Sequence, residues 1–202
     1  MDEKIKKIAA HIANIIRFQN QEIIGAENLD FDGPAILAPT HDSMLDPAPL
    51  IMATDRKLSF LNRKIDTRVD LWNTIINAIL QYFGAIQFDR KDAIVSLRAI
   101  TEEIEHILAN DELLVIYPEG TRKEVDHIQP GVAHYVLKYD LPVVPCARIG
   151  KWFKSPRHFV IGEAFEPERS KMKLTKAEQK RHISNQIEEA TMSLKMRYKK
   201  EE

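Results

Sequence analysis

The sequence is poor in cysteine, glycine and proline. Its 202 residues include one cysteine, seven glycines and ten prolines. The single Cys146 cannot form an internal disulfide, so nothing requires an oxidising compartment, and a reducing cytosol fits. Glycine and proline are too scarce for a collagen-like, linker-like or low-complexity protein. No apolar run approaches the roughly 18 to 20 residues of a membrane-spanning helix, and the first residues lack the apolar core of a secretory signal. We therefore expect a chain that neither spans a bilayer nor is exported by this route.

An excess of charge of one sign is also lacking. Lysine and arginine number 29 against 30 aspartates and glutamates, which gives a formal net charge of -1. Nucleic-acid binding usually requires a strong basic excess, so we expect no nucleic-acid partner. With 44% hydrophobic and 29% charged residues the composition is that of a globular protein. A chain of this length should bury about 70% of its unfolded surface, which excludes intrinsic disorder.

What the sequence does contain is a regular alternation of strand and helix signals. Short apolar runs predict strands at residues 35–38, 58–61, 85–88, 113–117, 143–147 and 158–162. Apolar residues at helical spacing predict helices at residues 46–53, 68–82, 91–108 and 129–139, and a terminal helix within 170–202. This alternation predicts an α/β fold, a single domain in which helices cover both faces of a mostly parallel or mixed central sheet. Ligands in such folds bind where strands end.

The amino-terminal segment, residues 1–20, is predicted to form an amphipathic helix ahead of a single domain at residues 21–202. Isoleucines line one side of this helix, and Lys4, Lys6, Lys7 and Arg17 flank them. The pattern fits a helix lying on an anionic membrane surface, and it fits a helix packed on the core equally well.

A histidine follows the first predicted strand, and an aspartate stands five positions later, in the run HDSMLDP of residues 41–47. A neutral His41 imidazole can take a proton from a hydroxyl near pH 7, and an Asp46 carboxylate on its other nitrogen would fix the tautomer. The alternative is that both side chains only brace a loop. The same spacing recurs at His106 and Asp111. We interpret this second match as a solvated helix end and use it as an internal control.

Two other strand ends carry arginine. The strand at 113–117 runs into PEGTRK at 118–123, where Gly120 permits close backbone approach and Arg122 offers a planar fork of donors for phosphate oxygens. The strand at 85–88 ends in DRK at 89–91, before a helix whose amino terminus favours an anion near Arg90. Together these features predict an anion site, although a surface ion pair would explain either arginine alone.

The run LPVVPC at residues 141–146 predicts a strand that carries a proline. Proline restricts a strand to an edge or to pairing that omits its missing donor, so we expect an edge beside a groove. The strand could wall an apolar channel or belong to the core, and Cys146 is expected to be a buried packing residue rather than a nucleophile. The sequence has no Gly-x-Ser-x-Gly elbow, nucleotide-binding glycine loop or Cys/His cluster with metal spacing.

Taken together, four segments resemble the blocks of the 1-acylglycerol-3-phosphate acyltransferase (lysophosphatidic acid acyltransferase) family, in order and in spacing. The resembling runs are HDSMLDP at 41–47, GAIQFDR at 84–90, EGTR at 119–122 and LPVVP at 141–145. This chain departs from the family at Thr40, where asparagine is frequent, and at Lys123, where serine is common. Asn62 and Arg63 replace the usual Ala-Lys, which leaves open whether Arg63 or Lys64 meets the ligand.

The resemblance implies transfer of a fatty acyl group from acyl-coenzyme A or acyl carrier protein to the free hydroxyl of 1-acylglycerol-3-phosphate, giving phosphatidic acid for phospholipid synthesis. His41 would be the general base and Asp46 its orienting partner, without an acyl-enzyme. The acceptor phosphate site would be formed by Arg63, Arg90, Glu119, Gly120, Thr121 and Arg122. Because a carboxylate repels phosphate, we expect Glu119 to hold a cation or a backbone N–H.

The resemblance also implies the partners and the cellular place. We expect a lysophospholipid acceptor, a thioester co-substrate, no metal or other cofactor, and a cytoplasmic protein peripheral on the inner face of the membrane. Alternatives are an acyltransferase with a different lysolipid acceptor, a thioesterase, and a non-catalytic lipid-binding protein of the same fold.

Overall fold

The structure is a computed structural model of the chain, and it describes residues 21–41, 46–63, 81–82, 84–88, 93–119, 131–150, 157–170 and 173–199. The predicted helix in residues 1–20 and all but the last two positions of the helix predicted at 68–82 lie outside these residues. In the described part of the chain, no helix has the length and apolar character needed to cross a bilayer.

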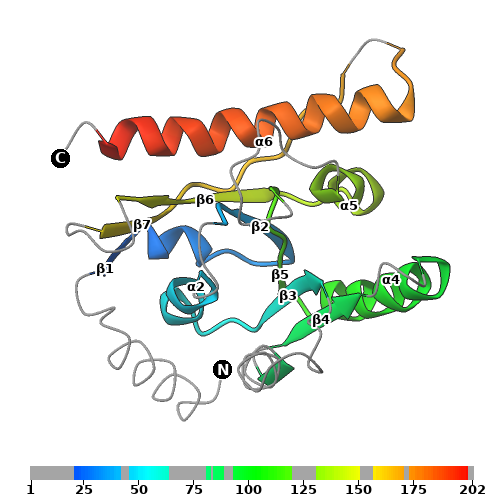
Figure 1. The fold of residues 1–202 in the computed structure, drawn as a ribbon, viewed down its shortest axis with the longest axis horizontal. Coiled ribbons are helices and arrows are strands. Elements are labelled where there is room, and N and C mark those ends of the chain that lie inside the picture. The colour runs from blue at the N-terminus through cyan, green and yellow to red at the C-terminus, as the bar shows by residue number, and fades with distance from the viewer. Residues whose placement is uncertain are drawn as a thin grey trace, which may run out of the picture.

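A seven-stranded sheet forms the centre of the molecule, in the order β1-β7-β6-β2-β5-β3-β4 (Figure 1). The strands are β1 (Gln21–Ile24), β2 (Ala35–Pro39), β3 (Leu58–Arg63), β4 (Ala85–Phe88), β5 (Leu113–Val115), β6 (Val143–Ile149) and β7 (Arg157–Ile161). Neighbouring strands run parallel except β6 and β7, which are antiparallel. The predicted mixed α/β sheet is confirmed, and β1 is the one strand of the sheet that the apolar pattern did not predict.

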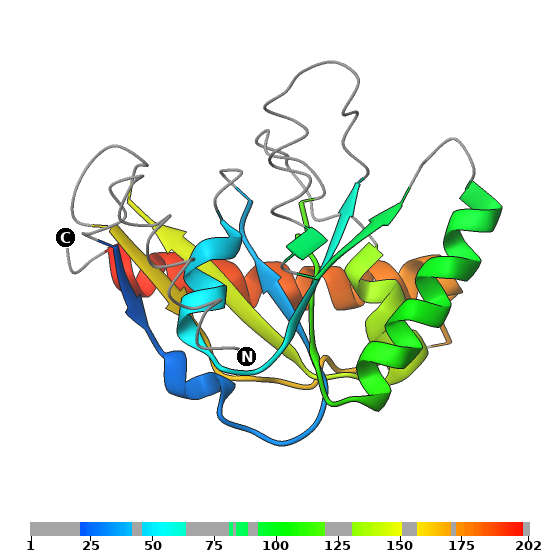
Figure 2. The ribbon, with the colours of Figure 1, turned by 90° about the horizontal axis from the view of Figure 1, so that it is seen from below.

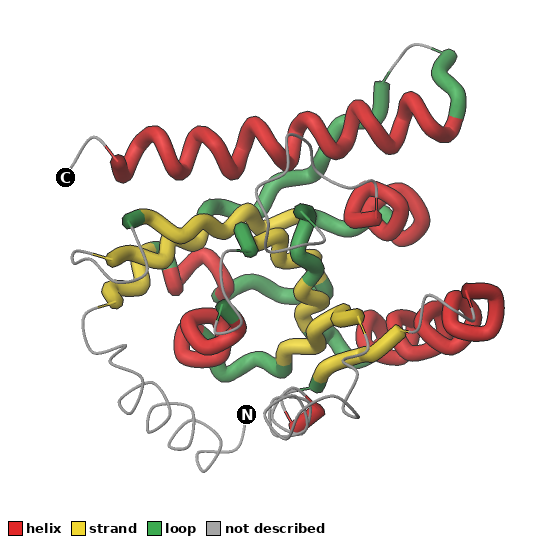
Figure 3. Tube along the Cα trace, viewed as in Figure 1, coloured by secondary structure: helices red, strands yellow, loops and turns green. Residues whose placement is uncertain are grey.

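Helices cover both faces of this sheet, as predicted (Figure 3). On one face lie the short 3-10 helix η2 (Ala26–Leu29) and α2 (Pro47–Ala53). The helices of the other face are α4 (Ala93–Ala109), α5 (Gly131–Tyr139) and α6 (Lys176–Lys199). The terminal helix α6 begins where Thr175 and Glu178 form a reciprocal capping box, with Thr175 N–H donating to Glu178 Oε2 at 2.8 Å and Glu178 N–H donating to Thr175 Oγ1 at 3.3 Å.

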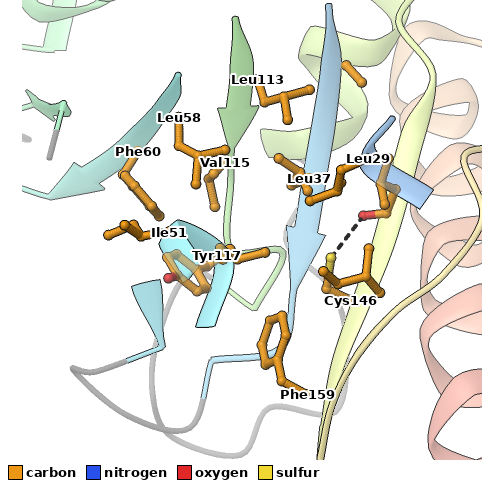
Figure 4. Close-up of a cluster of buried hydrophobic side chains, with 14 residues drawn as sticks. Leu29, Leu37, Ile51, Leu58, Phe60, Leu113, Val115, Tyr117, Cys146 and Phe159 are labelled. Carbon is orange, nitrogen blue, oxygen red and sulfur yellow. Dashed lines mark hydrogen bonds between the residues drawn. The ribbon is translucent and has the colours of Figure 1, made fainter. Parts of the chain in front are cut away.

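Strand alternation divides the core into two layers. Leu37, Val115 and Cys146 point toward α2 and pack with Leu50 and Ile51, whereas their strand neighbours point toward the long helices. Figure 4 shows Tyr117 and Cys146 among the buried side chains of the α2 layer. The prediction of Cys146 as a buried packing residue is therefore confirmed, and burial raises the pKa of its thiol far above the ordinary value.

The predicted edge position of the strand at 141–146 is wrong, because β6 lies between β7 and β2. The sheet accommodates Pro145 at a break in the pairing with β7. The antiparallel ladder starts at Cys146 and Ile161, and beyond it a single bridge joins Val143 to Phe165. Pro145 falls between these two, so its missing N–H interrupts no regular ladder bond.

The parallel strands bring their carboxyl ends to a single edge of the sheet. Figure 2 shows the arrowheads of β2, β3 and β4 pointing to this edge. The loop after β2 and the segment after β5 both leave the sheet here, because β2 pairs directly with β5. Side chains far apart in the sequence therefore converge at this edge, where ligands bind in open α/β sheets.

Candidate active site

His41 stands two residues beyond the carboxyl end of β2, and its imidazole meets Asp46. The distance from His41 Nδ1 to Asp46 Oδ2 is 3.1 Å. Asp46 occupies the N-cap of α2, and its side chain makes no capping bond to the first turn of the helix. A capping side chain accepts from the second or third helical N–H, and the third helical residue, Pro49, has none. The carboxylate is therefore available to His41, and the pairing predicted from the five-residue spacing is present.

The carboxylate of Asp46 is buried between two partners. Its side chain is 1% exposed, against 19% for His41. While Oδ2 faces His41, Oδ1 forms an ion pair with a guanidinium nitrogen of Arg148, whose side chain is also buried. Val144, Cys146 and Arg148 alternate along β6, which directs Arg148 toward the same face as α2. Three elements thus form a chain from imidazole to carboxylate to guanidinium.

Two hydrogen bonds of Thr40 fix the loop that carries His41 against β6. Thr40 N–H donates to the carbonyl of Cys146 at 3.1 Å. In return the N–H of Arg148 donates to Thr40 Oγ1 at 3.1 Å. Thr40, one of the residues at which this chain departs from the family pattern, thus holds the histidine loop and Arg148 in register.

Glu119 holds the same loop from the other side. The main-chain N–H of His41 donates to Glu119 Oε2 at 3.2 Å. Of the two roles left open for this carboxylate, holding a cation or holding a backbone N–H, the structure shows the second. Glu119 follows β5, so the pairing of β5 with β2 places it beside His41.

The ring of Tyr117 supports the imidazole. The ring centroids of His41 and Tyr117 are 4.2 Å apart and the planes are inclined by 31°. The Tyr117 hydroxyl is buried and finds no hydrogen-bond partner among the residues that the structure describes. Burial first, and then the charge of Asp46, raise the pKa of Tyr117 well above its usual value. The ring therefore acts as a neutral wall that limits the tilt of His41.

This arrangement favours a base at the outer nitrogen of His41. A carboxylate only accepts hydrogen bonds, so Nδ1 carries the hydrogen and Nε2 keeps a lone pair. The partly exposed ring is within reach of a ligand, whereas its orienting carboxylate is not. A proton taken up at Nε2 would give an imidazolium that Asp46 stabilises.

The structure does not describe the side chains of most residues predicted to bind the acceptor phosphate. Arg63 is the last residue of β3, in register with Phe88 of β4, so its backbone lies at the carboxyl edge. Its side chain lies outside the described part of the structure, as do residues 90 and 120–122. The roles of Arg63, Arg90, Gly120, Thr121 and Arg122 in an anion site stay predictions.

The control pair behaves as expected. His106 and Asp111 are both exposed, at the end of α4 and in the turn after it. The side-chain amide of Asn110 donates to the carbonyl of His106 at 2.7 Å, a bond of a helix end. The same five-residue spacing therefore corresponds to a His–Asp pair at His41 and to an exposed helix end at His106.

Arg148, Thr40 and Tyr117 complete the site, and the sequence analysis did not assign them to it. The available signal was an arginine at the end of an apolar strand, in the run VVPCAR of residues 143–148. Among the described residues, no group of three or more His, Cys, Asp or Glu side chains could hold a metal ion.

Comparison with known proteins places the chain. The model of a family described as Acyltransferase matches residues 16–148. The mouse protein 1-acyl-sn-glycerol-3-phosphate acyltransferase alpha is 24% identical over 128 residues, which are 61% of this chain and 43% of that protein. The chain thus spans less than half the length of this relative.

A solved structure shares the fold. The crystal structure of the 1-acyl-sn-glycerophosphate (LPA) acyltransferase PlsC from Thermotoga maritima superposes with a TM-score of 0.63 at 19% identity, over 96% of this chain and 79% of that one. The family match includes the loop of His41 and Asp46, the segment of Glu119 and the strand of Arg148. The resemblance drawn from the four sequence blocks is confirmed, and the chain belongs to the acyltransferase family.

Proposed function

We propose that this chain transfers a fatty acyl group from acyl-coenzyme A or acyl carrier protein to the free hydroxyl of 1-acylglycerol-3-phosphate, producing phosphatidic acid. The observation that carries the proposal is the His41–Asp46 contact of 3.1 Å at the carboxyl edge of the sheet of an acyltransferase-family chain. The named activity of the mouse relative supports the choice of acceptor.

In the proposed reaction His41 Nε2 removes the proton of the acceptor hydroxyl. The oxygen attacks the thioester carbonyl, a C–O bond forms, and the C–S bond breaks as the tetrahedral intermediate collapses. The imidazolium then returns its proton to the leaving thiolate. No side chain is acylated, and the one cysteine is a buried core residue with a raised pKa, which agrees with direct transfer.

General-base assistance contributes about 10²- to 10⁴-fold, so the remaining acceleration must come from placing acceptor and thioester together. Arg63, Arg90 and Arg122, with Gly120 and Thr121, are proposed to hold the acceptor phosphate. Glu119 would contribute indirectly, through the N–H of His41 that it binds. The reaction as proposed uses no metal or other cofactor.

Because the acceptor is a membrane lipid, we propose that the chain works at the cytoplasmic surface of a membrane. The isoleucine and lysine pattern of residues 1–20 would supply one contact with anionic lipid. Residues 21–202 would then form the catalytic domain.

Thiol release from the thioester tests the proposal against its rivals. Purified protein is mixed with acyl-coenzyme A, or with acyl carrier protein, in the presence and in the absence of lysophosphatidate. We expect release that depends on lysophosphatidate and equals the phosphatidate formed.

The rivals predict other results in the same assay. Thiol release at the same rate with and without lysophosphatidate would indicate a thioesterase, in which water replaces the acceptor. No release with either donor would favour a non-catalytic lipid-binding protein. A panel of other lysolipids tests the acceptor, and a preference for one of them over lysophosphatidate would overturn the proposed head group.

A further inference from the structure

The buried guanidinium of Arg148 is the feature of the site that the proposed reaction does not yet use. Arg148 reaches Asp46 from β6, and the side chains of this pair are 3% and 1% exposed. Taking two charges out of water is costly, and it is repaid only when they compensate each other with good geometry. Such a pair directly behind a proposed general base calls for a functional explanation.

We propose that Arg148 is a positioning residue that keeps the carboxylate of Asp46 correctly aimed at His41. This inference rests on the proposed function for its catalytic consequence, but its structural part does not. Asp46 has one oxygen toward His41 and the other toward Arg148. A carboxylate held at Oδ1 cannot rotate Oδ2 away from the imidazole, so the guanidinium fixes the plane in which Nδ1 must lie.

Arg148 itself is held in place by the loop that it serves. Its main-chain N–H donates to Thr40 Oγ1, and Thr40 is the residue before His41. The β2–β6 register that pairs Pro39 with Cys146 brings these two segments side by side. The imidazole and the guanidinium are therefore set by a single hydrogen-bonded unit, and they clamp Asp46 from opposite sides.

The positive charge of Arg148 lies directly against the carboxylate that pairs with His41. Removing a cation beside a titrating pair favours uptake of a proton by that pair, whichever member receives it. The active form, a neutral imidazole beside a carboxylate, would then survive only at higher pH. The acid side of the pH–rate profile should therefore move upward when the charge is lost.

The groups around Asp46 come from several elements of the fold. α2 itself has no acidic residue in its first turn and no basic residue in its last. In the described part of the chain, the titratable groups near Asp46 or against its partners include His41, Glu119, Tyr117, Cys146 and Arg148. Among these Arg148 is the permanent cation. Neither tyrosine nor thiol titrates near neutral pH here, since burial raises the pKa of both.

The test compares Arg148→Met with Arg148→Lys in the full-length protein. For Arg148→Met we expect the pH midpoint of the acid limb of kcat/KM to rise by about one unit or more, with a lower kcat and little change in KM for lysophosphatidate. Arg148→Lys keeps the charge but not the fork, so its midpoint should stay within about 0.3 units of the wild type while kcat falls partly. Equal midpoint shifts in both variants, or no shift in folded Arg148→Met, would overturn the proposal.

A matched control separates loss of charge from loss of stability. The side chain of Arg56 donates to the carbonyls of Phe31 and Asp111 at 2.9 and 2.8 Å, near the amino ends of the strands and away from His41. Arg56→Met removes a cation of the same size that also ties segments together. It should lower the thermal unfolding temperature but leave the pH midpoint where it is. A comparable midpoint shift in Arg56→Met would contradict the role of Arg148.

Two further readouts test this role. The first needs no substrate, and the second shows whether Arg148 acts through Asp46. The ring resonances of His41, assigned by comparison with His41→Ala, should show the same upward shift of the titration midpoint in Arg148→Met without any ligand. In the Asp46→Asn background, Arg148→Met should change kcat by less than about twofold, because the residue acts through the carboxylate. A further loss as large as in the wild-type background would refute the inference.

The outcomes also distinguish the two proposals. A wild-type protein that transfers nothing to lysophosphatidate overturns the proposed function, while the His41 ring titration still tests Arg148. Conversely, active wild type with an unmoved midpoint in Arg148→Met overturns the role of Arg148 alone.

Discussion

Replacing Asp46 by asparagine should lower stability strongly as well as activity, whereas replacing His41 by alanine should lower activity strongly and stability only slightly. Asp46→Asn keeps the shape of the side chain but leaves the buried Arg148 without a compensating charge. Breaking a buried ion pair by removing one partner costs about 3 to 5 kcal/mol. The amide oxygen can still accept a hydrogen bond, so the lower figure of about 3 kcal/mol applies.

This free energy translates into a measurable change in unfolding temperature. For a chain of this size each kcal/mol lowers the unfolding temperature by about 2 to 4 °C, so Asp46→Asn should lower it by about 6 to 12 °C. His41→Ala leaves the Asp46–Arg148 pair intact and loses one partly exposed hydrogen bond of about 1 kcal/mol. Its unfolding temperature should therefore fall by no more than about 4 °C.

Thermal unfolding followed by circular dichroism at pH 7, with phosphatidate formation measured in parallel, checks both halves of this prediction. Repeating the scans at high salt adds a control, because salt screens a buried pair far less than an exposed one. An Asp46→Asn protein as stable as the wild type, or a His41→Ala protein that is the less stable of the two, would refute the reasoning.

Three further substitutions test separate parts of the site and the fold. Arg122→Ala should raise the lysophosphatidate concentration for half-maximal rate by about tenfold or more, since a charged hydrogen bond contributes about 1.5 to 3 kcal/mol. An unchanged dependence of the rate on this concentration would count against the phosphate-binding role of Arg122. Cys146→Ala should keep the rate of acyl transfer within about threefold of the wild type. In the wild-type protein the thiol should resist alkylation at pH 8 until the protein unfolds, because burial raises its pKa. Rapid labelling of the folded protein would contradict this. Gly25→Ala should cost about 2 kcal/mol or more in chemical denaturation, because φ is +78° and the new Cβ would lie 2.2 Å from the carbonyl of Ile161. Gly33→Ala, with φ +88° but open space, is its control and should cost less, so equal losses would argue against the clash.

Local sequence patterns predicted most strands and helices of this fold, and in the site they predicted the pair of His41 and Asp46. The runs at Ala35–Pro39 and Leu113–Val115 are wholly buried strands, and continuous apolar sequence bounded by turn residues predicts such strands well. His41 and Asp46 could be paired from the sequence because they are only five positions apart and a proline-initiated helix starts directly after Asp46.

Interactions across long stretches of sequence could not be predicted in this way. Arg148 lies 102 residues from Asp46, and the parallel pairing of β2 with β6 brings them together. The interior place of β6 depends on the break in pairing at Pro145, which involves Phe165 and Ile161. The strand Gln21–Ile24 was missed because its first half is polar and it lies at the edge of the sheet.

The most direct measurement compares phosphatidate formation by His41→Ala and His106→Ala. Both histidines precede an aspartate by five positions, but His41 lies in the candidate site and His106 at the exposed end of α4. The exposed His106 has no proposed part in the chemistry. We predict that His41→Ala loses about 10²- to 10⁴-fold in the rate of acyl transfer to lysophosphatidate, while His106→Ala stays close to the wild type. Similar rates in the two variants, whether both high or both low, would contradict the assignment of His41 as the base.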